Sequence, residues 1–142
     1  MTYSELKERQ QQEINAFPFI WAFNESQLAD GMRRLGLDPE KDKDKLCSIG
    51  AGGVIRKADA DAMRAMFDRH RRELQEAIAA DKTGDGFIYD MFYTELANHE
   101  YIITGDLEPT LNALDLSLEE INSSKALLHG LKKAMAAQNE YS

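Results

Sequence analysis

The chain has 142 residues, 43% of them hydrophobic, so it is long enough to bury the core of one domain and too apolar for intrinsic disorder. The formal net charge of −8 argues against a protein whose main role is to bind nucleic acid, since such proteins are usually basic. Cys47 is the single cysteine, the N-terminal segment has no apolar signal-peptide core, and no apolar run is long enough to cross a membrane. These features predict a cytoplasmic protein without membrane contact.

The charge is unevenly distributed along the chain. Residues 1–55 carry a net charge of −2, residues 56–72 carry +3, and residues 73–142 carry −9. An acidic region of this kind either serves solubility or attracts a basic partner. The sequence leaves both explanations open.

Local patterns predict a helix, a strand and a second helix at the start of the chain. Thr2 and Glu5 have the spacing of a capping box, which predicts a helix through about Ala16. The aromatic segment 17–23 contains a proline and is typical of an edge strand. Asn24 is a cap for the next helix.

A glycine-rich hairpin and a long helix are expected next. The segment GAGG at residues 50–53 separates two short apolar runs and predicts strands near 46–50 and 53–57. It lacks the spacing of a phosphate-binding loop. Cys47 is expected to be a small buried side chain in the first strand.

Helical periodicity predicts a long helix from Asp59 or Asp61 to about Ala80 and another over residues 87–99. Arg64 and Asp68 on the outer face of the long helix are expected to pair. The two helices are predicted to pack through five apolar side chains: Met66, Phe67, Leu74, Phe92 and Leu96.

The C-terminal part predicts short helices with clear caps. The segment YIITGD at 101–106 is expected to be extended, and Asp106 is expected to cap a short helix. Ser117 and Glu120 form another capping box, and a serine at 123 or 124 begins the last helix. The predicted fold class is α+β, a mostly helical single domain with a small antiparallel sheet.

Residues 81–92, DKTGDGFIYDMF, resemble the first part of a calcium-binding loop. Asp81, Thr83 and Asp85 occupy its first, third and fifth positions, but Phe92 stands where the bidentate glutamate belongs. The segment therefore predicts an interhelical turn without tight calcium binding, in which Asp85 caps the following helix.

A second metal hypothesis uses four residues on two helices: His70, Glu73, Glu95 and His99. The spacings of three and four residues place each pair on one helix face, and glutamate and histidine are common ligands in helical bundles. The usual Glu-x-x-His order is missing, so we expect no metal and no cofactor.

Three segments resemble a family of small uncharacterised proteins associated with mobile genetic elements of gut bacteria: FPFIWAFNESQL, SIGAGGVIRKADADAMRAMFDRH and AADKTGDGFIYDMFYTELANHEY. The similarity extends from about Tyr3 to Lys133. It implies no catalytic residue. It does imply a setting in which small acidic proteins inhibit host defence, for example by occupying the basic channel of a CRISPR nuclease.

The leading hypothesis is a non-enzymatic, anti-CRISPR-type interaction protein that binds a basic host protein such as a CRISPR or restriction nuclease. The alternative is a structural or regulatory homo-oligomer that presents the apolar part of its C-terminal helices, and a metal protein is the third possibility. The predicted partner-binding residues are six acids: Asp81, Asp85, Asp90, Glu100, Asp106 and Glu108.

Overall fold

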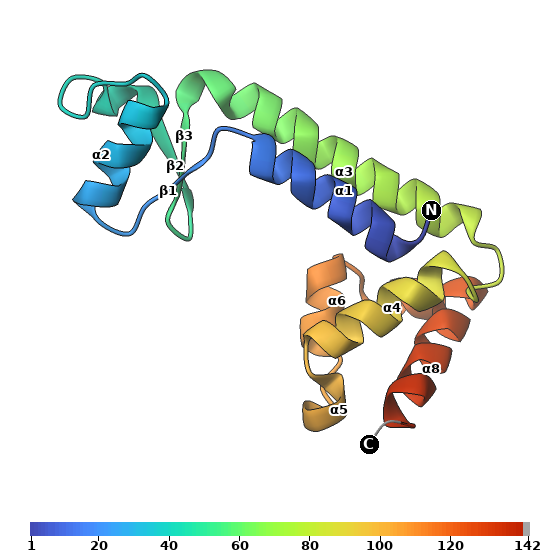
Figure 1. Cartoon of the computed structure of the whole chain (residues 1–142). Coiled ribbons are helices and arrows are strands. Elements are labelled where there is room, and N and C mark those ends of the chain that lie inside the picture. Colours follow the sequence, from blue (N-terminus) through green and yellow to red (C-terminus); the bar gives the residue numbers. More distant parts are fainter. Residues whose placement is uncertain (141–142) are drawn as a thin grey trace. The chain divides into compact units, whose positions relative to one another are not determined.

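The structure, a computed structural model, describes residues 1–140. Within this part, helices predominate and three short strands form one antiparallel sheet, which confirms the predicted α+β class (Figure 1). The chain divides into two compact units. The helical unit comprises residues 1–10 and 72–142, and the sheet unit comprises residues 11–71. The prediction of a single domain stays a prediction.

The boundary between the units passes through two continuous helices. These are α1 (Tyr3–Ala16) and α3 (Ala60–Ala80). Each helix therefore contributes one part of its length to each unit. No helix in the described residues has the length and apolar character that a membrane span requires.

The sheet unit contains one further α-helix, two short 3₁₀ turns and the sheet. Their bounds are β1 (Ile20–Trp21), α2 (Glu25–Arg34), η1 (Lys43–Lys45), β2 (Leu46–Gly50), β3 (Gly53–Arg56) and η2 (Lys57–Asp59). The strand order is β1-β3-β2, with both pairs antiparallel. The predicted strand at 46–50 is confirmed, the one at 53–57 ends a residue early, and the one at 17–23 is only two residues long.

The core of the sheet unit is small. Phe19, Ile55 and Met66 form a buried cluster, which Ile14 and Met63 extend. On α2, Gly31 allows the helix to approach β1, because a Cβ there would lie 2.5 Å from Cγ2 of the fully buried Ile20. Close packing at a glycine therefore holds α2 on the sheet.

Cys47 is exposed, so its predicted burial is wrong. The reason is its strand: β2 lies at the sheet edge, and only Leu46 of its five residues is even partly buried. The alternation of burial expected of a strand needs a covering layer, which β2 lacks among the described residues.

The helical unit is built around α4 and α8, which pack against each other extensively. Its other helices are short, and the bounds are α4 (Phe87–Asn98), α5 (Tyr101–Thr104), α6 (Glu108–Leu114), α7 (Leu118–Asn122) and α8 (Lys125–Asn139). Met91, Phe92 and Leu96 on α4 are fully buried, and Leu131 and Ala134 on α8 join the same core.

The predicted capping signals are confirmed at four helices. Thr2 and Glu5 exchange hydrogen bonds at the start of α1. The Asn24 side chain accepts a hydrogen bond from the backbone N–H of Gln27 in α2. Ser117 and Glu120 form the predicted capping box of α7. Ser124 caps α8 by accepting from the backbone of Leu127.

The segment after α4 is helical, so the expected extended conformation of YIITGD is wrong. Glu100 and Gly105 have positive φ angles of 57° and 68° and bracket the single turn of α5. These left-handed residues stop the helices on either side and allow the chain to reverse direction.

The predicted packing of the long helix is also wrong in part. Only Leu74 belongs to the core that contains Phe92 and Leu96. Met66 belongs to the sheet-unit core, and Phe67 is 38% exposed, with its ring 6.4 Å from that of Phe19. The apolar stripe of α3 therefore serves two separate cores.

The predicted pair of Arg64 and Asp68 is wrong as well. Arg64 pairs with Asp61, and Asp68 pairs with Arg71, each three residues apart.

Candidate functional site

The charged residues are distributed very differently between the two units. Residues 1–10 and 72–142 hold 15 acidic and 7 basic side chains, whereas residues 11–71 hold ten of each. The net charge of −8 therefore belongs entirely to the helical unit. All six predicted partner-binding acids lie in this unit, but they have different surroundings.

Asp81 organises the turn between α3 and α4. Its Oδ1 accepts hydrogen bonds from the backbone N–H groups of Thr83 and Gly84, and its Oδ2 accepts from those of Gly86 and Ile88. Burial acts to raise the pKa of Asp81, but these four donors outweigh it and hold the pKa below its ordinary value. Asp81 thus accepts the backbone N–H groups at the start of α4, whose N-cap residue is Gly86.

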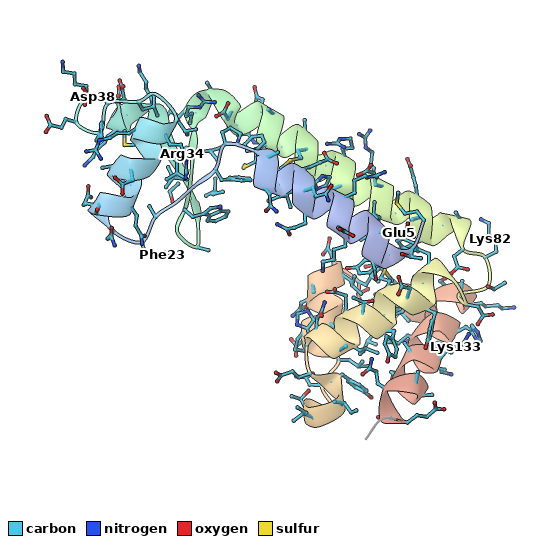
Figure 2. The ribbon with its side chains drawn as sticks, in the orientation of Figure 1. Glu5, Phe23, Arg34, Asp38, Lys82 and Lys133 are labelled. Carbon is cyan, nitrogen blue, oxygen red and sulfur yellow. The ribbon has the colours of Figure 1, made fainter. Side chains whose placement is uncertain are left out.

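Asp85 does not cap α4, so that prediction is wrong. Its Oδ1 lies 2.7 Å from His129 Nε2 and 3.1 Å from Lys133 Nζ, both on α8 (Figure 2 labels Lys133). The hydrogen bonds from His129 and Lys133 lower the pKa of Asp85. Asp85 therefore ties the turn to α8.

Gly84 completes the contact between the turn and α8. It has a φ of +86°, and a Cβ on it would collide with the backbone carbonyl of Ala126. The hydrogen bonds of Asp81 and Asp85 and the close approach of Gly84 to α8 explain why these residues stand at positions that resemble a calcium-binding loop. The absence of tight calcium binding stays a prediction.

The remaining four acids divide into one engaged residue and three exposed ones. Asp90 on α4 accepts hydrogen bonds from the backbone N–H and the hydroxyl of Ser4. Glu100, Asp106 and Glu108 are exposed around α5 and the start of α6. Asp106 also accepts from the backbone N–H of Glu108, but the N-cap residue of α6 is Leu107, so the predicted cap is wrong by one residue.

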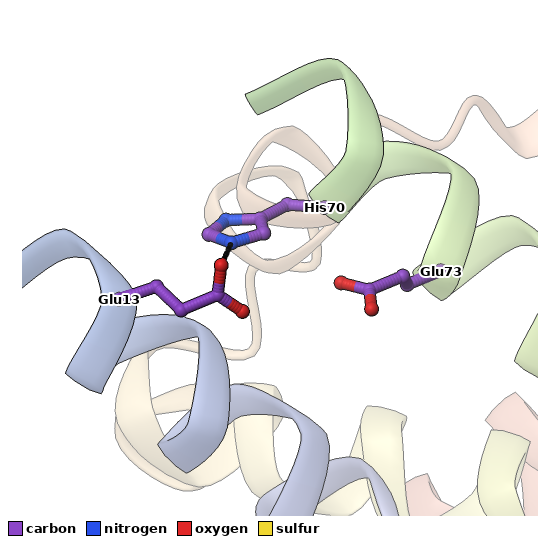
Figure 3. Close-up of side chains that lie close together, drawn as sticks. All are labelled: Glu13, His70 and Glu73. Carbon is purple, nitrogen blue, oxygen red and sulfur yellow. Dashed lines mark ion pairs between the residues drawn. The ribbon is translucent and has the colours of Figure 1, made fainter. Parts of the chain in front are cut away.

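The four residues of the metal hypothesis all take part in ion pairs. Glu95 and His99 lie together, with 3.6 Å between Oε2 and Nε2. Glu73 pairs with Arg9 at 2.6 Å. His70 Nε2 lies 3.5 Å from Oε2 of Glu13 (Figure 3).

Cations neutralise the carboxylates of these ion pairs. Arg69 donates to the Glu13 carboxylate through Nη1 and Nη2. This hydrogen bonding is the main cause of the lowered pKa of Glu13. Lys7 Nζ lies 2.8 Å from Oε1 of the buried Glu95. The expected absence of a metal site stays a prediction.

The buried network around Glu95 was missed by the sequence analysis. Asn98 donates to Glu95 at 3.1 Å, and Lys7 reaches it from α1. Burial raises the pKa of Tyr3, and the negative charge of Glu95 raises it further. No local signal predicts this network, because Lys7 and Glu95 are far apart in sequence.

The fold and the charge distribution define a mostly helical α+β protein whose net negative charge is confined to one of two units. Residues 2–137 match a family described as a family of unknown function, DUF7659, so the chain belongs to that family. No curated protein matches the chain. No solved structure matches it either. Membership confirms the predicted uncharacterised family, and the association with mobile elements stays a prediction.

Proposed function

We propose that this protein is a non-enzymatic interaction protein that binds a basic partner through its helical unit. The observation that supports this proposal is the segregation of charge: one unit carries the whole net charge of −8, and the other is neutral. A need for solubility alone does not require the acids to gather in one unit. A concentrated negative field instead attracts and orients a positively charged protein surface.

The exposed acids Glu100, Asp106 and Glu108 are the best candidates for direct contact with the partner. Asp81 and Asp85 use their carboxylates to hold the turn, and Asp90 binds the start of α1. These three contribute to the field, but removing them would also disturb the fold. The proposed contact surface is therefore narrower than the six residues predicted from the sequence.

The more specific form of the proposal is inhibition of a host nucleic-acid-handling defence protein, of the CRISPR nuclease or restriction type. Such enzymes hold nucleic acid in a positively charged channel. An acidic protein surface competes for such a channel without contacting nucleic acid itself. The family match leaves this role open, and it is proposed on the charge distribution alone.

The proposal is tested with two matched triple variants. Glu100→Gln, Asp106→Asn and Glu108→Gln remove three charges from the helical unit, and Asp30→Asn, Glu40→Gln and Asp44→Asn remove three from the sheet unit. The partner is first captured from host lysate at low salt. We expect the helical-unit variant to associate with the partner at least about tenfold more slowly than the wild-type protein. Charges that attract a partner over a distance act mainly on the association rate.

The sheet-unit variant serves as the control for net charge. Equal association rates for both variants and the wild-type protein, measured by surface plasmon resonance at two salt concentrations, would contradict the proposal. Circular dichroism confirms that each variant is folded.

Self-association remains a second candidate, through the predicted C-terminal helices or through the sheet unit. The apolar stripe of α8 is buried in the core of the helical unit, but Ile103 on α5 and Leu118 on α7 are 79% and 54% exposed. In the sheet unit, Trp21 and Phe23 are 55% and 79% exposed, and Ile49 lies beside Trp21 over Gly53. Phe23→Ser should then lower a dimer signal in sedimentation velocity without any dependence on salt.

A further inference from the structure

The sheet unit contains an open cleft of about 610 Å³ whose walls come from residues 11–35. The end of α1, the segment that leads into β1, and the end of α2 surround it. Its polar and aromatic lining consists of Gln11, Asn15, Phe17, Phe19, Trp21 and Arg34. The volume falls within the range of about 300–1,000 Å³ that is usual for small-molecule sites.

One wall of the cleft is a row of aromatic rings. Phe17, Phe19 and Trp21 occupy every second position of this segment. The ring centroids of Phe17 and Phe19 are 4.8 Å apart, and those of Phe19 and Trp21 are 5.5 Å apart. Phe19 is buried, whereas the indole of Trp21 is largely exposed at the end of the row. Trp21 therefore offers a supported aromatic face on which another flat ring can stack.

The other lining side chains include polar groups. Gln11 Nε2 donates to Asn15 Oδ1 at 2.9 Å, which leaves the Asn15 amide hydrogens and the Gln11 carbonyl oxygen available side by side. Arg34, at the end of α2 (Figure 2), is the one ionisable side chain among the described residues that line the cleft.

Arg34 has no acidic partner within residues 1–140, whereas its neighbour Arg33 pairs with Asp30 at 3.1 Å. A guanidinium without a carboxylate partner, at the rim of an aromatic cleft, is suited to an anionic group on a ligand.

We propose that this cleft binds a small molecule that combines one flat ring with one anionic group. The ring stacks on Trp21, the anionic group binds Arg34, and the carboxamides of Gln11 and Asn15 bind polar atoms at the edge of the ring. A phosphate and a carboxylate both satisfy the anionic requirement. The site lies in the neutral unit and is independent of the proposed acidic surface.

The ligand class is tested with four probes by calorimetry. AMP carries a ring and a phosphate, and 3-phenylpropionate carries a ring and a carboxylate. Adenosine lacks the anion, and ribose 5-phosphate lacks the ring. We expect AMP, 3-phenylpropionate or both to bind with saturable heat, and each incomplete probe to bind at least about tenfold more weakly than AMP or not at all.

Binding is located by fluorescence and by two adjacent variants. Trp21 is the single tryptophan, so a saturable change in its emission places the ring at the cleft. Arg34→Gln should weaken binding by about tenfold or more, and Arg34→Lys should restore part of it. Arg33→Gln is the matched control and should leave the affinity unchanged.

Which complete probe binds identifies the anion, and either result supports the site. The proposal is wrong if neither AMP nor 3-phenylpropionate binds at millimolar concentration. It is also wrong if AMP binds and adenosine binds with the same affinity, or if Arg33→Gln and Arg34→Gln have the same effect in proteins that circular dichroism shows to be folded.

Discussion

At the scale of single residues, Asp81 explains why the turn after α3 has the letters of a calcium loop. A carboxylate at the start of a tight loop has two uses, since it can coordinate a cation or accept backbone N–H groups. In this protein both oxygens accept backbone hydrogen bonds, and the last of them comes from Ile88, seven residues further on. The local chemistry of helix capping is sufficient to account for the motif.

Asp81→Asn should destabilise the protein by about 1–2 kcal/mol at pH 7, because an amide nitrogen cannot accept the bonds from Gly86 and Ile88. The lowered pKa of Asp81 stabilises the folded state above the unfolded pKa of about 4, and this contribution is lost as the pH falls through the folded value.

The variant should therefore lose less stability than the wild-type protein between pH 5 and pH 2, as measured by urea unfolding. Asp44→Asn, on an exposed turn of the sheet unit, is the control. Parallel stability curves for wild type and Asp81→Asn would rule out this role of Asp81.

Residue-scale reasoning from the sequence succeeds where the interaction is local. The capping boxes at Thr2 and Ser117 were predicted because both partners lie within three residues. Asp85 was wrongly predicted to cap α4, because its actual partners, His129 and Lys133, lie on a helix more than forty residues away in sequence. Spacing alone does not reveal such contacts.

At the scale of elements, buried polar groups join the helices of the helical unit. Lys7 of α1 binds the buried Glu95 of α4, and the side chains of Thr110 and Gln138 donate to backbone carbonyls of α4. These bonds satisfy groups that would otherwise be buried at a cost. They also fix which part of α4 faces each neighbour.

Lys7→Met should destabilise the protein by about 1–3 kcal/mol, because the Glu95 carboxylate would stay buried without its cation. Burial acts to raise the pKa of Glu95, and in the wild-type protein Lys7 and the other donors outweigh it. Without Lys7 the pKa of Glu95 should rise. The variant should then recover stability relative to wild type as the pH is lowered toward the new pKa.

A double-mutant cycle with Glu95→Gln measures the coupling directly. Glu95→Gln should remove most of the additional cost of Lys7→Met in thermal unfolding. Additive effects of the two changes would show that the pair does not interact.

The periodicity of α3 predicted which residues are apolar but not which core they enter. A helix pattern identifies a face, and the same face of α3 contacts Phe19 near Phe67 and the Phe92 core near Leu74. The sequence contains no break at this point, because the helix itself is continuous. The exposed edge strand β2 and the cleft beside Trp21 were not predicted either, because both depend on how the elements pack against one another.

At the scale of the whole molecule, the concentration of charge has a thermodynamic effect. The helical unit holds 15 acidic and 7 basic side chains, so its exposed acids repel one another. The ion pair between the exposed Lys7 and the buried Glu95 is screened less by salt than the repulsion between fully exposed groups. Salt should therefore relieve more repulsion than attraction in this unit.

Raising NaCl from about 0.01 M to about 0.15 M shortens the screening length from about 30 Å to about 8 Å. We expect slower hydrogen exchange in peptides from α4 and α8 under these conditions, and little change in peptides from β2 and β3. Mass spectrometry measures both sets in one sample. Faster exchange in α4 and α8 at the higher salt would show that exposed ion pairs outweigh repulsion.

The division of the helical unit between residues 1–10 and 72–142 also sets an order for folding during synthesis. Tyr3 packs edge-on against Phe87, with 5.8 Å between their ring centroids, and Lys7 forms its ion pair with Glu95. All residues of the sheet unit leave the ribosome before either partner emerges. The nascent chain is therefore expected to carry a finished sheet unit while Tyr3 and Leu6 stay exposed, and these two side chains are natural contacts for a ribosome-bound chaperone until α4 and α8 emerge.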